Sequence, residues 1–440
     1  SPEEDWSWNM AVMLSAQHQG LPLTEELYAR LTAETPWKGN VERLYGRWAS
    51  KRDAYEWAME TIQPQCHPNI LFTLGLRSDW TGNPWTLYDY AVASRGFAFW
   101  LDDADPEERS IIEEICRKGD FKPGAIVMGY AKSGDDLLYV TNRYNIGYVV
   151  SDYYANGSFW CSYPNKSFKQ RPGKAVKAEN GKIYVSVVFS DGDNVQFDQN
   201  ALYAIWTEDT DRGAFPVGTT LCAGMQELNP FLLEWYYKHM SPNDELMAGP
   251  SGYQFIYGRD YSEEGYEKWL ELNRRWLASA GFKTACFWHT SYGTDRFYRY
   301  AETAGLEGVF NGDDDVVLDY HDGVIIMNQG DHLVAEGDLY NNLAHRQGLA
   351  RGDERIEALK ALGVDGILDP SRPHFLNVYP TAATYGYHGV ARLKREAERL
   401  EKDFPGRFVF LMPKDNVATA RKYYEAHPEH IPWKNKPQNK

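Results

Sequence analysis

From residue 125 onward, short apolar segments rich in β-branched residues alternate with segments of helical periodicity. Strands are expected at residues 125–129, 147–151, 183–189, 217–221, 284–288, 308–310, 324–327, 366–368 and 408–411. Helices are expected at residues 230–238, 262–280, 295–303, 353–362 and 387–403. This alternation produces parallel βαβ units, and about eight such strands favour a closed, TIM-like (β/α) barrel. A doubly wound open sheet is the alternative, although no GxGxxG segment follows a strand.

The residues before this alternation are expected to form a smaller α/β domain. It holds strands at 69–74 and 96–101 and helices at 53–62, 87–94 and 105–118. The last helix has a strong start signal, because Asp105 is a good N-cap and Pro106 suits the first helical position. The segment Lys122-Pro123-Gly124 marks a natural boundary. The sequence therefore predicts a small domain over 1–122 and a (β/α)-barrel-like catalytic domain over 123–440.

The chain is unusually rich in aromatic residues. Its 440 residues include 15 Trp, 30 Tyr and 19 Phe. Core packing rarely needs so many Trp and Tyr side chains, because their polar tips require partners or water. Flat amphipathic rings suit ligands that present flat faces edged with hydroxyl groups, as sugars do. The composition therefore favours a carbohydrate partner.

Charge and cysteine content exclude several classes of protein. The net charge of −16 and the lack of a basic run argue against nucleic-acid binding. No apolar run reaches the roughly 18 residues of a membrane span. The five cysteines are far apart and form no CxxC pair, which argues against a structural zinc site or a disulfide scaffold. No cofactor is expected, and nothing in the sequence indicates the oligomeric state.

The residues just past each predicted strand are the candidates for chemistry, because barrel active sites lie at the carboxyl ends of strands. Asp191, Asp193 and Asn194 follow the strand at 183–189. They suit a catalytic acid or nucleophile, a clamp for sugar hydroxyls, or a cation site, whereas a simple Asp/Gly turn is the alternative. Glu227 follows the strand at 217–221, just before a helix, where an acid also complements the helix dipole.

Later strand ends carry further polar and aromatic residues. His289 follows the strand at 284–288 and is flanked by Trp288 and Tyr292. We expect it to contact a sugar or to act as an acid/base group near neutral pH, and a purely structural histidine is the alternative. Asp313 begins a run of three acids. Two interpretations are open for this run: a Ca²⁺ site or a solvated loop. Asp331 lies in a polar cluster after the strand at 324–327. Tyr253 in the segment 247–257 and Trp160 in the loop after 147–151 are expected to contact the sugar.

Three segments resemble the bacterial family of putative glycoside hydrolases named for a GxGYxYP motif. They are residues 186–196 (SVVFSDGDNVQ), 249–257 around the naming motif, and 156–162. In the naming motif Gly252 and Tyr253 match, while Phe255 and Ile256 replace the second Tyr and the Pro. The resemblance implies a barrel-like C-terminal domain, a carbohydrate substrate, and a periplasmic or extracellular location after removal of an export signal.

The sequence leaves three hypotheses open. The first is a glycoside hydrolase in which Asp191 or Asp193 forms a carboxylate pair with Glu227 to cleave a poly- or oligosaccharide. His289 and Asp313 then assist as substrate contacts or partners of the carboxylates. The second is a metal-dependent polysaccharide lyase or deacetylase. The third is a glycan-binding protein without catalysis, for which the acids at the strand ends are not needed.

Overall fold

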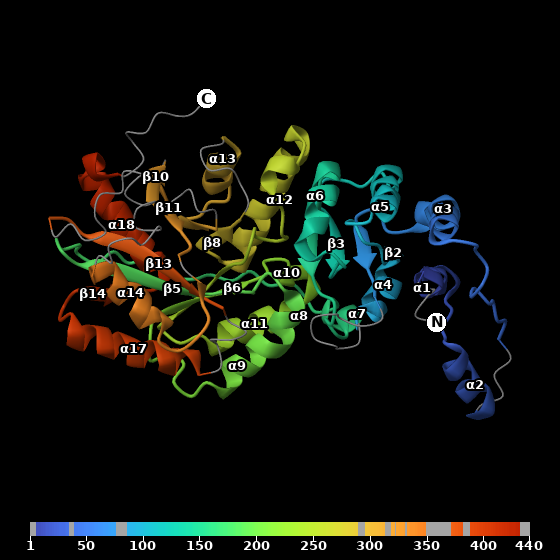
Figure 1. Ribbon diagram of the computed structural model, residues 1–440, viewed down its shortest axis with the longest axis horizontal. Helices are drawn as coiled ribbons and strands as arrows, with labels where there is room; N and C mark the ends of the chain where they lie inside the picture. The colour runs from blue at the N-terminus through green and yellow to red at the C-terminus, as the bar shows by residue number, and fades with distance from the viewer. Residues whose placement is uncertain are drawn as a thin grey trace. The chain divides into compact units, whose positions relative to one another are not determined.

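The computed structural model describes most of the chain. The described residues are 6–34, 39–75, 86–288, 295–312, 318–321, 323–330, 332–348, 371–381 and 388–431. The chain folds as two units (Figure 1). The first unit comprises Ser1–Tyr163 with Asp260–Trp269, and the second comprises Pro164–Arg259 with Leu270–Lys440.

The first unit is built on a four-stranded parallel sheet in the order β2-β1-β3-β4. Its strands are β1 (Ile70–Thr73), β2 (Phe97–Phe99), β3 (Ala125–Gly129) and β4 (Ile146–Val150). Its helices are α1 (Trp6–His18), α2 (Glu25–Glu34), α3 (Lys51–Thr61), α4 (Tyr88–Ser94), α5 (Pro106–Lys118), α6 (Leu138–Thr141) and α7 (Gly157–Trp160), with the short turns η1 (Gln63–Gln65), η2 (Gly134–Leu137) and η3 (Asn142–Tyr144). Asp105 caps α5, and its carboxylate accepts hydrogen bonds from the amides of Glu107 and Glu108.

The division between the two units differs from the 122/123 boundary expected from the sequence. β3 and β4 follow residue 122, and β3 hydrogen-bonds to β1 while β4 hydrogen-bonds to β3. These two strands therefore complete the sheet of the first unit, and the Lys122-Pro123-Gly124 segment is a turn within it. The second unit begins at Pro164.

The second unit is built on a ten-stranded sheet in the order β10-β11-β9-β8-β7-β6-β5-β13-β12, with β14 also paired to β5. Every strand pair is parallel except β10–β11. The strands are β5 (Ile183–Phe189), β6 (Val217–Leu221), β7 (Asp244–Ala248), β8 (Thr284–Phe287), β9 (Gly308–Asn311), β10 (Leu318–His321), β11 (Val324–Asn328), β12 (His332–Leu333), β13 (His374–Pro380) and β14 (Phe408–Phe410).

Helices connect most of these strands. They are α8 (Val195–Phe197), α9 (Tyr203–Glu208), α10 (Met225–Leu228), α11 (Pro230–His239), α13 (Asp295–Thr303), α14 (Asp338–Gly348), α17 (Gly389–Asp403) and α18 (Pro413–Ala426), with a π-helical turn η4 (Asp198–Leu202) and the short turn η6 (Pro428–His430). Helix α12 (Glu263–Ala280) is divided between the two units, and the turn η5 (Gly258–Asp260) precedes it. Helix α18 covers the sheet through Val417, Ala420 and Tyr424, which join the core residues of β5, β11 and β13.

The structure confirms the α/β fold expected from the sequence, and the sheet of the second unit is curled. It does not confirm the closed TIM-like barrel. In the described residues the hydrogen-bonded order ends at β10 on one side and β12 on the other. The sheet also divides at β5, because Ile183, Tyr184 and Val185 pair with β14 while Val188 and Phe189 pair with β6. A strand that changes neighbour halfway along its length cannot keep the constant stagger of a regular barrel. The sheet is therefore a half-barrel.

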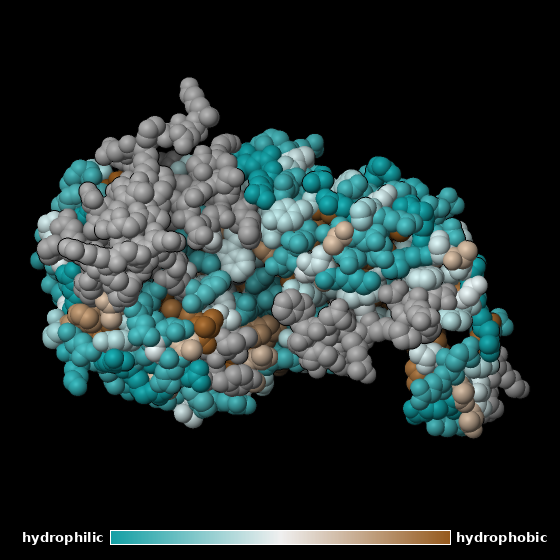
Figure 2. Space-filling view, viewed as in Figure 1, coloured by the Kyte–Doolittle hydropathy of each residue, from teal (hydrophilic) through white to brown (hydrophobic). Residues whose placement is uncertain are grey.

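Hydrophilic residues cover most of the surface visible in Figure 2, as expected for a chain with a net charge of −16. Among the helices that the structure describes, none is long and apolar enough to cross a membrane. All five cysteines are free thiols.

Candidate active site at the ends of the strands

The turn after β5 is fixed by contacts with the two next strands. All seven residues of β5 are buried, so the position where it ends is fixed by the core. The amide of Gly192 donates a hydrogen bond to Thr220 Oγ1 of β6 at 3.0 Å. A Cβ atom at Gly249, just past β7, would lie 2.7 Å from the backbone nitrogen of Asp193. The Asp191–Asp193 turn therefore lies directly over the carboxyl ends of β6 and β7.

The backbone of the turn directs the two carboxylates in a defined way. Asp191 has a φ of +71°, in the left-handed region that residues with a Cβ atom rarely adopt. Its Oδ2 accepts a hydrogen bond from Ser190 Oγ at 2.8 Å. The amide of Asn194 donates to the carbonyl oxygen of Asp191 at 3.1 Å, and Asn194 starts helix α8. Asp191, Asp193 and Asn194 are each partly exposed and are therefore accessible to a ligand.

A third carboxyl group, that of Asp198, lies close to this turn and was not predicted from the sequence. Asp198 is completely buried at the first residue of the π-helical turn, and its Oδ2 accepts a hydrogen bond from the amide of Cys222 at 3.4 Å. Burial raises the pKa of this carboxyl well above its ordinary value, and the charges of Asp193 and Asp191 raise it further. Burial and the neighbouring charges therefore both favour the protonated form of Asp198.

Glu227 lies on α10, the short helix after β6. Its side chain is exposed at the surface, but partial desolvation raises the pKa of its carboxyl, and the positive charge of Arg275 on α12 lowers it. The charge of Glu227 also acts on the hydroxyl of Tyr253. The structure thus groups Asp191 and Asp193 electrostatically with Asp198, and Glu227 with Tyr253 and Arg275.

The segment that carries Tyr253 joins these two groups. The Cys222 thiol donates to the carbonyl oxygen of Tyr253 at 3.7 Å, and burial, followed by the nearby Asp198 and Asp193 carboxyl groups, raises the pKa of that thiol. The amide of Tyr253 donates to Asn273 Oδ1 at 3.0 Å. Gly252 has a φ of +126°, and a Cβ atom there would lie 2.0 Å from the same Asn273 oxygen, so only glycine fits. The segment Gly252-Tyr253 therefore acts through its backbone, next to both sets of carboxyl groups.

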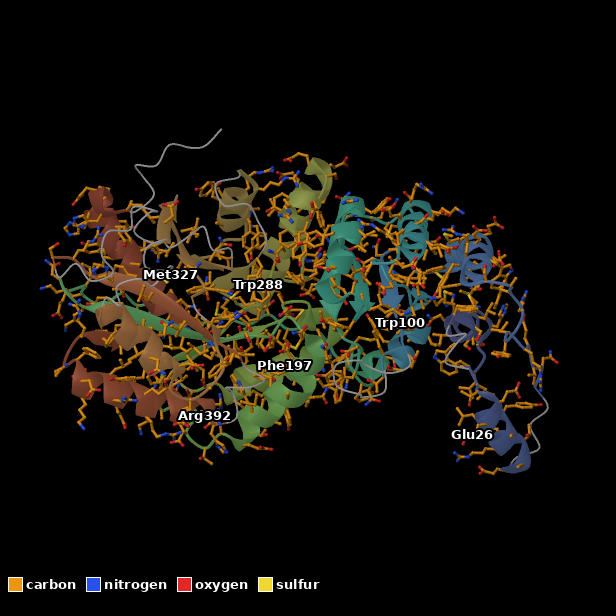
Figure 3. All side chains as sticks on the ribbon, in the orientation of Figure 1. Glu26, Trp100, Phe197, Trp288, Met327 and Arg392 are labelled. Carbon is orange, nitrogen blue, oxygen red and sulfur yellow. The ribbon has the colours of Figure 1, made fainter. Side chains whose placement is uncertain are left out.

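Aromatic side chains surround the end of β8. Trp288, labelled in Figure 3, makes edge-to-face contacts with Phe255 and Tyr379, whose ring centroids lie 6.0 and 6.1 Å from its own. Its indole Nε1 donates to Gln329 Oε1 at 2.6 Å. The charges of Asp191 and Asp193 act on the hydroxyl of Tyr379, so these rings lie near the two carboxylates. Trp288 is thus a partly exposed ring held in one orientation.

The remaining predicted residues fall elsewhere. His289, Tyr292, Asp313 and Asp331 lie outside the described residues, and their roles stay predictions. Trp160 belongs to the first unit, where it lies on α7 and packs against Phe159 and Tyr163.

The structure adds residues that the sequence did not point to: Asp198, Cys222 and Tyr379. The one signal for Asp198 was its position in the sequence, four residues after Asn194, which places it one helical turn beyond the predicted loop. The other two join the site only through packing between strands that are distant in the sequence. Gln329 belongs to the polar cluster predicted after the strand at 324–327.

Fold and site together define an α/β protein with carboxyl groups and aromatic rings at the carboxyl ends of parallel strands. Residues 181–404 match the GxGYxYP putative glycoside hydrolase C-terminal domain, and residues 70–162 match the GxGYxYP third domain. The chain belongs to the GxGYxYP family, which confirms the resemblance noted in the sequence.

Solved structures give a consistent picture of the fold. The crystal structure of a putative hydrolase from Bacteroides thetaiotaomicron VPI-5482 is 19% identical in sequence to this chain. The match covers 95% of this chain and 78% of the hydrolase chain, with a TM-score of 0.73. Puue allantoinase is 16% identical, and the match covers 63% of this chain and 99% of the allantoinase chain, with a TM-score of 0.36. A putative polysaccharide deacetylase from Mycobacterium smegmatis is 12% identical, and the match covers 60% of this chain and 96% of the deacetylase chain, with a TM-score of 0.34. No curated protein matches the chain. The first structure shares the fold, and at these scores the other two carry no argument.

Proposed function

We propose that this protein is a glycoside hydrolase in which Asp191, Asp193 and Glu227 carry out the reaction on a poly- or oligosaccharide. The observation that supports it most is the position of Asp191 and Asp193, two partly exposed carboxylates over the ends of β6 and β7, whose charges act on Tyr379, a ring that packs against Trp288. Glycosidases use two carboxyl groups on either side of the scissile bond. The membership of the chain in a family named for glycoside hydrolases agrees with this chemistry.

The different surroundings of the carboxyl groups suggest different roles. We assign Glu227 as the general acid: its side chain is exposed, but partial desolvation raises the pKa of its carboxyl, which is the direction that favours a proton for the leaving oxygen. Asp191 and Asp193 act on the other side of the sugar, one as nucleophile or base and the other as an acceptor for sugar hydroxyl groups. Ser190 orients Asp191 through its hydroxyl.

Two further groups support the reaction without taking a proton from the sugar. Asp198 is a positioning residue: it is completely buried, and burial raises the pKa of its carboxyl, which disfavours a third negative charge beside Asp191 and Asp193. Trp288 offers a flat ring held by Gln329, Phe255 and Tyr379, which suits stacking against the apolar face of a sugar. A periplasmic or extracellular location, where polysaccharides are met, fits this proposal and remains a prediction.

The experiment is hydrolysis of a panel of polysaccharides by the wild type and by Asp191→Asn, Asp193→Asn and Glu227→Gln. We expect new reducing ends with the wild type and a loss of at least about 100-fold in kcat for Glu227→Gln and for one of the Asp variants, since general acid–base groups contribute about that much. Glu234→Gln on α11 is the matched control, because Glu234 pairs with Lys166 and Lys238 at the surface and its loss leaves the rate unchanged.

The same panel separates the other hypotheses. Activity that is lost with a chelator and restored by one metal ion, or an unsaturated product that absorbs in the ultraviolet, identifies a lyase or deacetylase instead. Tight binding of a glycan without turnover identifies a binding protein. Full activity in all three acid variants would exclude the assignment of these residues.

A further inference from the structure

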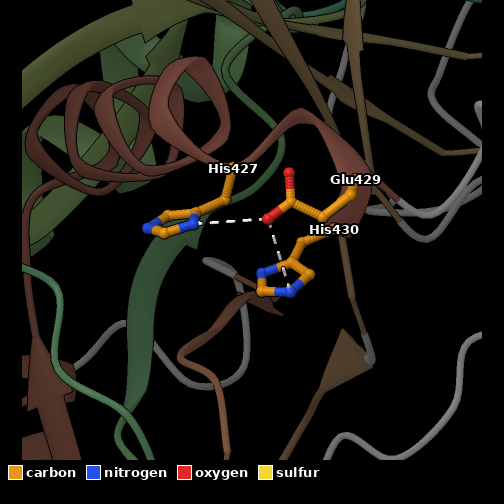
Figure 4. A group of neighbouring side chains, drawn as sticks. All are labelled: His427, Glu429 and His430. Atoms are coloured by element: carbon orange, nitrogen blue, oxygen red, sulfur yellow. Dashed lines mark ion pairs between the residues drawn. The ribbon is translucent and has the colours of Figure 1, made fainter.

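Two histidines and one glutamate gather at the end of α18 (Figure 4). His427 follows the last residue of the helix, and Glu429 and His430 lie in the short turn η6. His427 Nδ1 lies 3.4 Å from Glu429 Oε1, and His430 Nε2 lies 3.8 Å from the same oxygen. One potential ligand atom from each residue lies within 4.8 Å of the other two. All three atoms therefore lie close enough together to share one ion.

These distances fit a tetrahedral zinc site. Zinc bonds of about 2.0–2.1 Å to histidine nitrogen and carboxylate oxygen put neighbouring ligand atoms about 3.3 Å apart. The two measured separations of 3.4 and 3.8 Å are close to that edge length. The side chains keep 46%, 62% and 33% of their surface exposed, so small rotations complete the geometry and an ion reaches the site from solvent. Two imidazoles and one carboxylate form a common ligand set for zinc with one open position.

A tyrosine next to the group selects the histidine nitrogen that faces the ion. Tyr423 hydroxyl lies 2.6 Å from His430 Nδ1, which leaves Nε2 of the same ring directed at Glu429. Histidines that bind metals usually have their second nitrogen hydrogen-bonded in this way. The Tyr423 ring also packs against both imidazoles, with centroids 4.7 Å from His427 and 5.8 Å from His430. The Tyr423 side chain thus holds both imidazoles close to the orientation that an ion needs.

The support beneath the group is rigid. Helix α18 is anchored to the core of the second unit by Val417, Ala420 and Tyr424. The amide of His427 donates to the carbonyl oxygen of Tyr423 at 2.9 Å, and the amide of His430 donates to the carbonyl oxygen of His427 at 3.0 Å. The carboxyl end of a helix also carries a partial negative charge that favours a cation.

We propose that His427 Nδ1, Glu429 Oε1 and His430 Nε2 bind a zinc ion, with a water molecule as the fourth ligand. The site ties the end of α18 to η6 and is separate from the strand-end carboxylates. It does not depend on the proposed hydrolase function.

The test is calorimetric titration of Zn²⁺ into the full chain after removal of metals with a chelator. We expect one zinc ion per chain in the wild type, and loss of that site in the His427→Ala/His430→Ala double variant. Tyr423→Phe keeps the ring and removes the hydroxyl, so it weakens binding by about 10-fold. His239→Ala is the control: His239 ends α11 with its Nδ1 against the Trp235 carbonyl, and its loss leaves the affinity unchanged.

Cobalt gives a second readout that does not depend on affinity. Co²⁺ in a tetrahedral site of this kind produces intense visible bands, which we expect in the wild type and not in the double variant. Equal zinc binding by the wild type and the double variant, or no saturable binding by the wild type, would overturn the proposal. Asp191→Asn keeps the zinc site, so failure of the proposed hydrolase function and failure of the zinc site are distinguishable.

Discussion

The backbone amide of Gly192 is hydrogen-bonded to the Thr220 hydroxyl, and this contact fixes the Asp191–Asp193 turn to the neighbouring strand. The same hydroxyl donates to the carbonyl oxygen of Phe189 at 2.8 Å, so one side chain holds both the last residue of β5 and the turn after it. A Cβ atom at Gly192 would lie 1.7 Å from the Thr220 carbonyl oxygen. The positions of both carboxylates therefore depend on a glycine between them.

Gly192→Ala is expected to move this turn. The added methyl group meets backbone atoms of β6, which cannot rotate away, so we expect a loss of stability of about 1–3 kcal/mol, as for overpacked cores. Thermal unfolding measures it, and activity should fall with it because Asp191 and Asp193 are displaced. Gly20→Ala is the control, since a Cβ atom there meets its nearest neighbour at an ordinary 3.7 Å. Equal melting temperatures for the wild type and Gly192→Ala would refute the argument.

Replacement of Thr220 tests the hydrogen bonds from the other side. Thr220→Val keeps the shape of the side chain but leaves the Gly192 amide and the Phe189 carbonyl without their partner. A buried unpaired polar group costs about 1–3 kcal/mol, so chemical denaturation should show a loss in this range. Thr220→Ser retains the hydroxyl and should lose less. If Val and Ser variants are equally stable, the hydroxyl is not what holds the turn.

Trp288 is expected to determine substrate affinity more than rate. Trp288→Ala removes the partly exposed ring that packs against Tyr379, and we expect KM for the glycan to rise about 10-fold or more, because stacking on an aromatic ring contributes about 0.5–1.5 kcal/mol beyond buried area. Gln329→Leu frees the indole Nε1 and should raise KM by a smaller factor. Steady-state kinetics on the glycan found in the panel separate KM from kcat. A fall in kcat with unchanged KM would contradict this role.

The strands with plain apolar patterns were predicted well. β5 and β6 begin and end where the sequence placed them, because a run of buried β-branched residues bounded by polar residues has few alternatives. β7 was missed, since its sequence DELMA starts with two acids. Those acids are buried in pairs: Asp244 with Arg212 at 2.8 Å, and Glu245 with Thr284 Oγ1 at 2.6 Å. Partners so distant in the sequence cannot be read from a local pattern.

The candidate site shows the same contrast between features that a local sequence pattern predicts and features that depend on packing. The Asp191–Asp193 turn was found because it follows a strand whose end is clear. The zinc-binding group was missed because His427, Glu429 and His430 lie beyond the last predicted strand, where only the short HPEH segment marks them. Asp198 was missed because a sequence does not show which carboxyl group is buried. That property comes from packing.

Asp198→Asn is expected to change how stability depends on pH. The carboxyl of an unfolded Asp has a pKa of about 3.9, while burial and the charges of Asp193 and Asp191 raise the pKa of folded Asp198 well above that. Between these two values the folded chain binds one more proton than the unfolded chain. Stability therefore falls as pH rises, by about 1.4 kcal/mol per pH unit in that window.

The neutral amide removes this term, so Asp198→Asn should lose less stability than the wild type between pH 5 and pH 8. Chemical denaturation at both values measures the difference. Asp120→Asn, at a side chain that is 88% exposed, is the control and should follow the wild type. Identical pH dependence for the wild type and Asp198→Asn would show that Asp198 is not protonated in the folded chain.

Arg275 is expected to adjust the alkaline limit of activity through Glu227. Its positive charge lowers the pKa of the Glu227 carboxyl, which burial raises. If Glu227 is the general acid, activity is lost as pH rises through that pKa, because the proton is then gone. Arg275→Met removes the charge, so the pKa of Glu227 rises and the alkaline limb of kcat/KM moves to higher pH. We expect this shift to be smaller at high salt, since Arg275 is exposed. Arg275→Lys keeps the charge and the limb stays in place. An alkaline limb that does not move in Arg275→Met, or one that moves to lower pH, would assign the proton donor to a different residue.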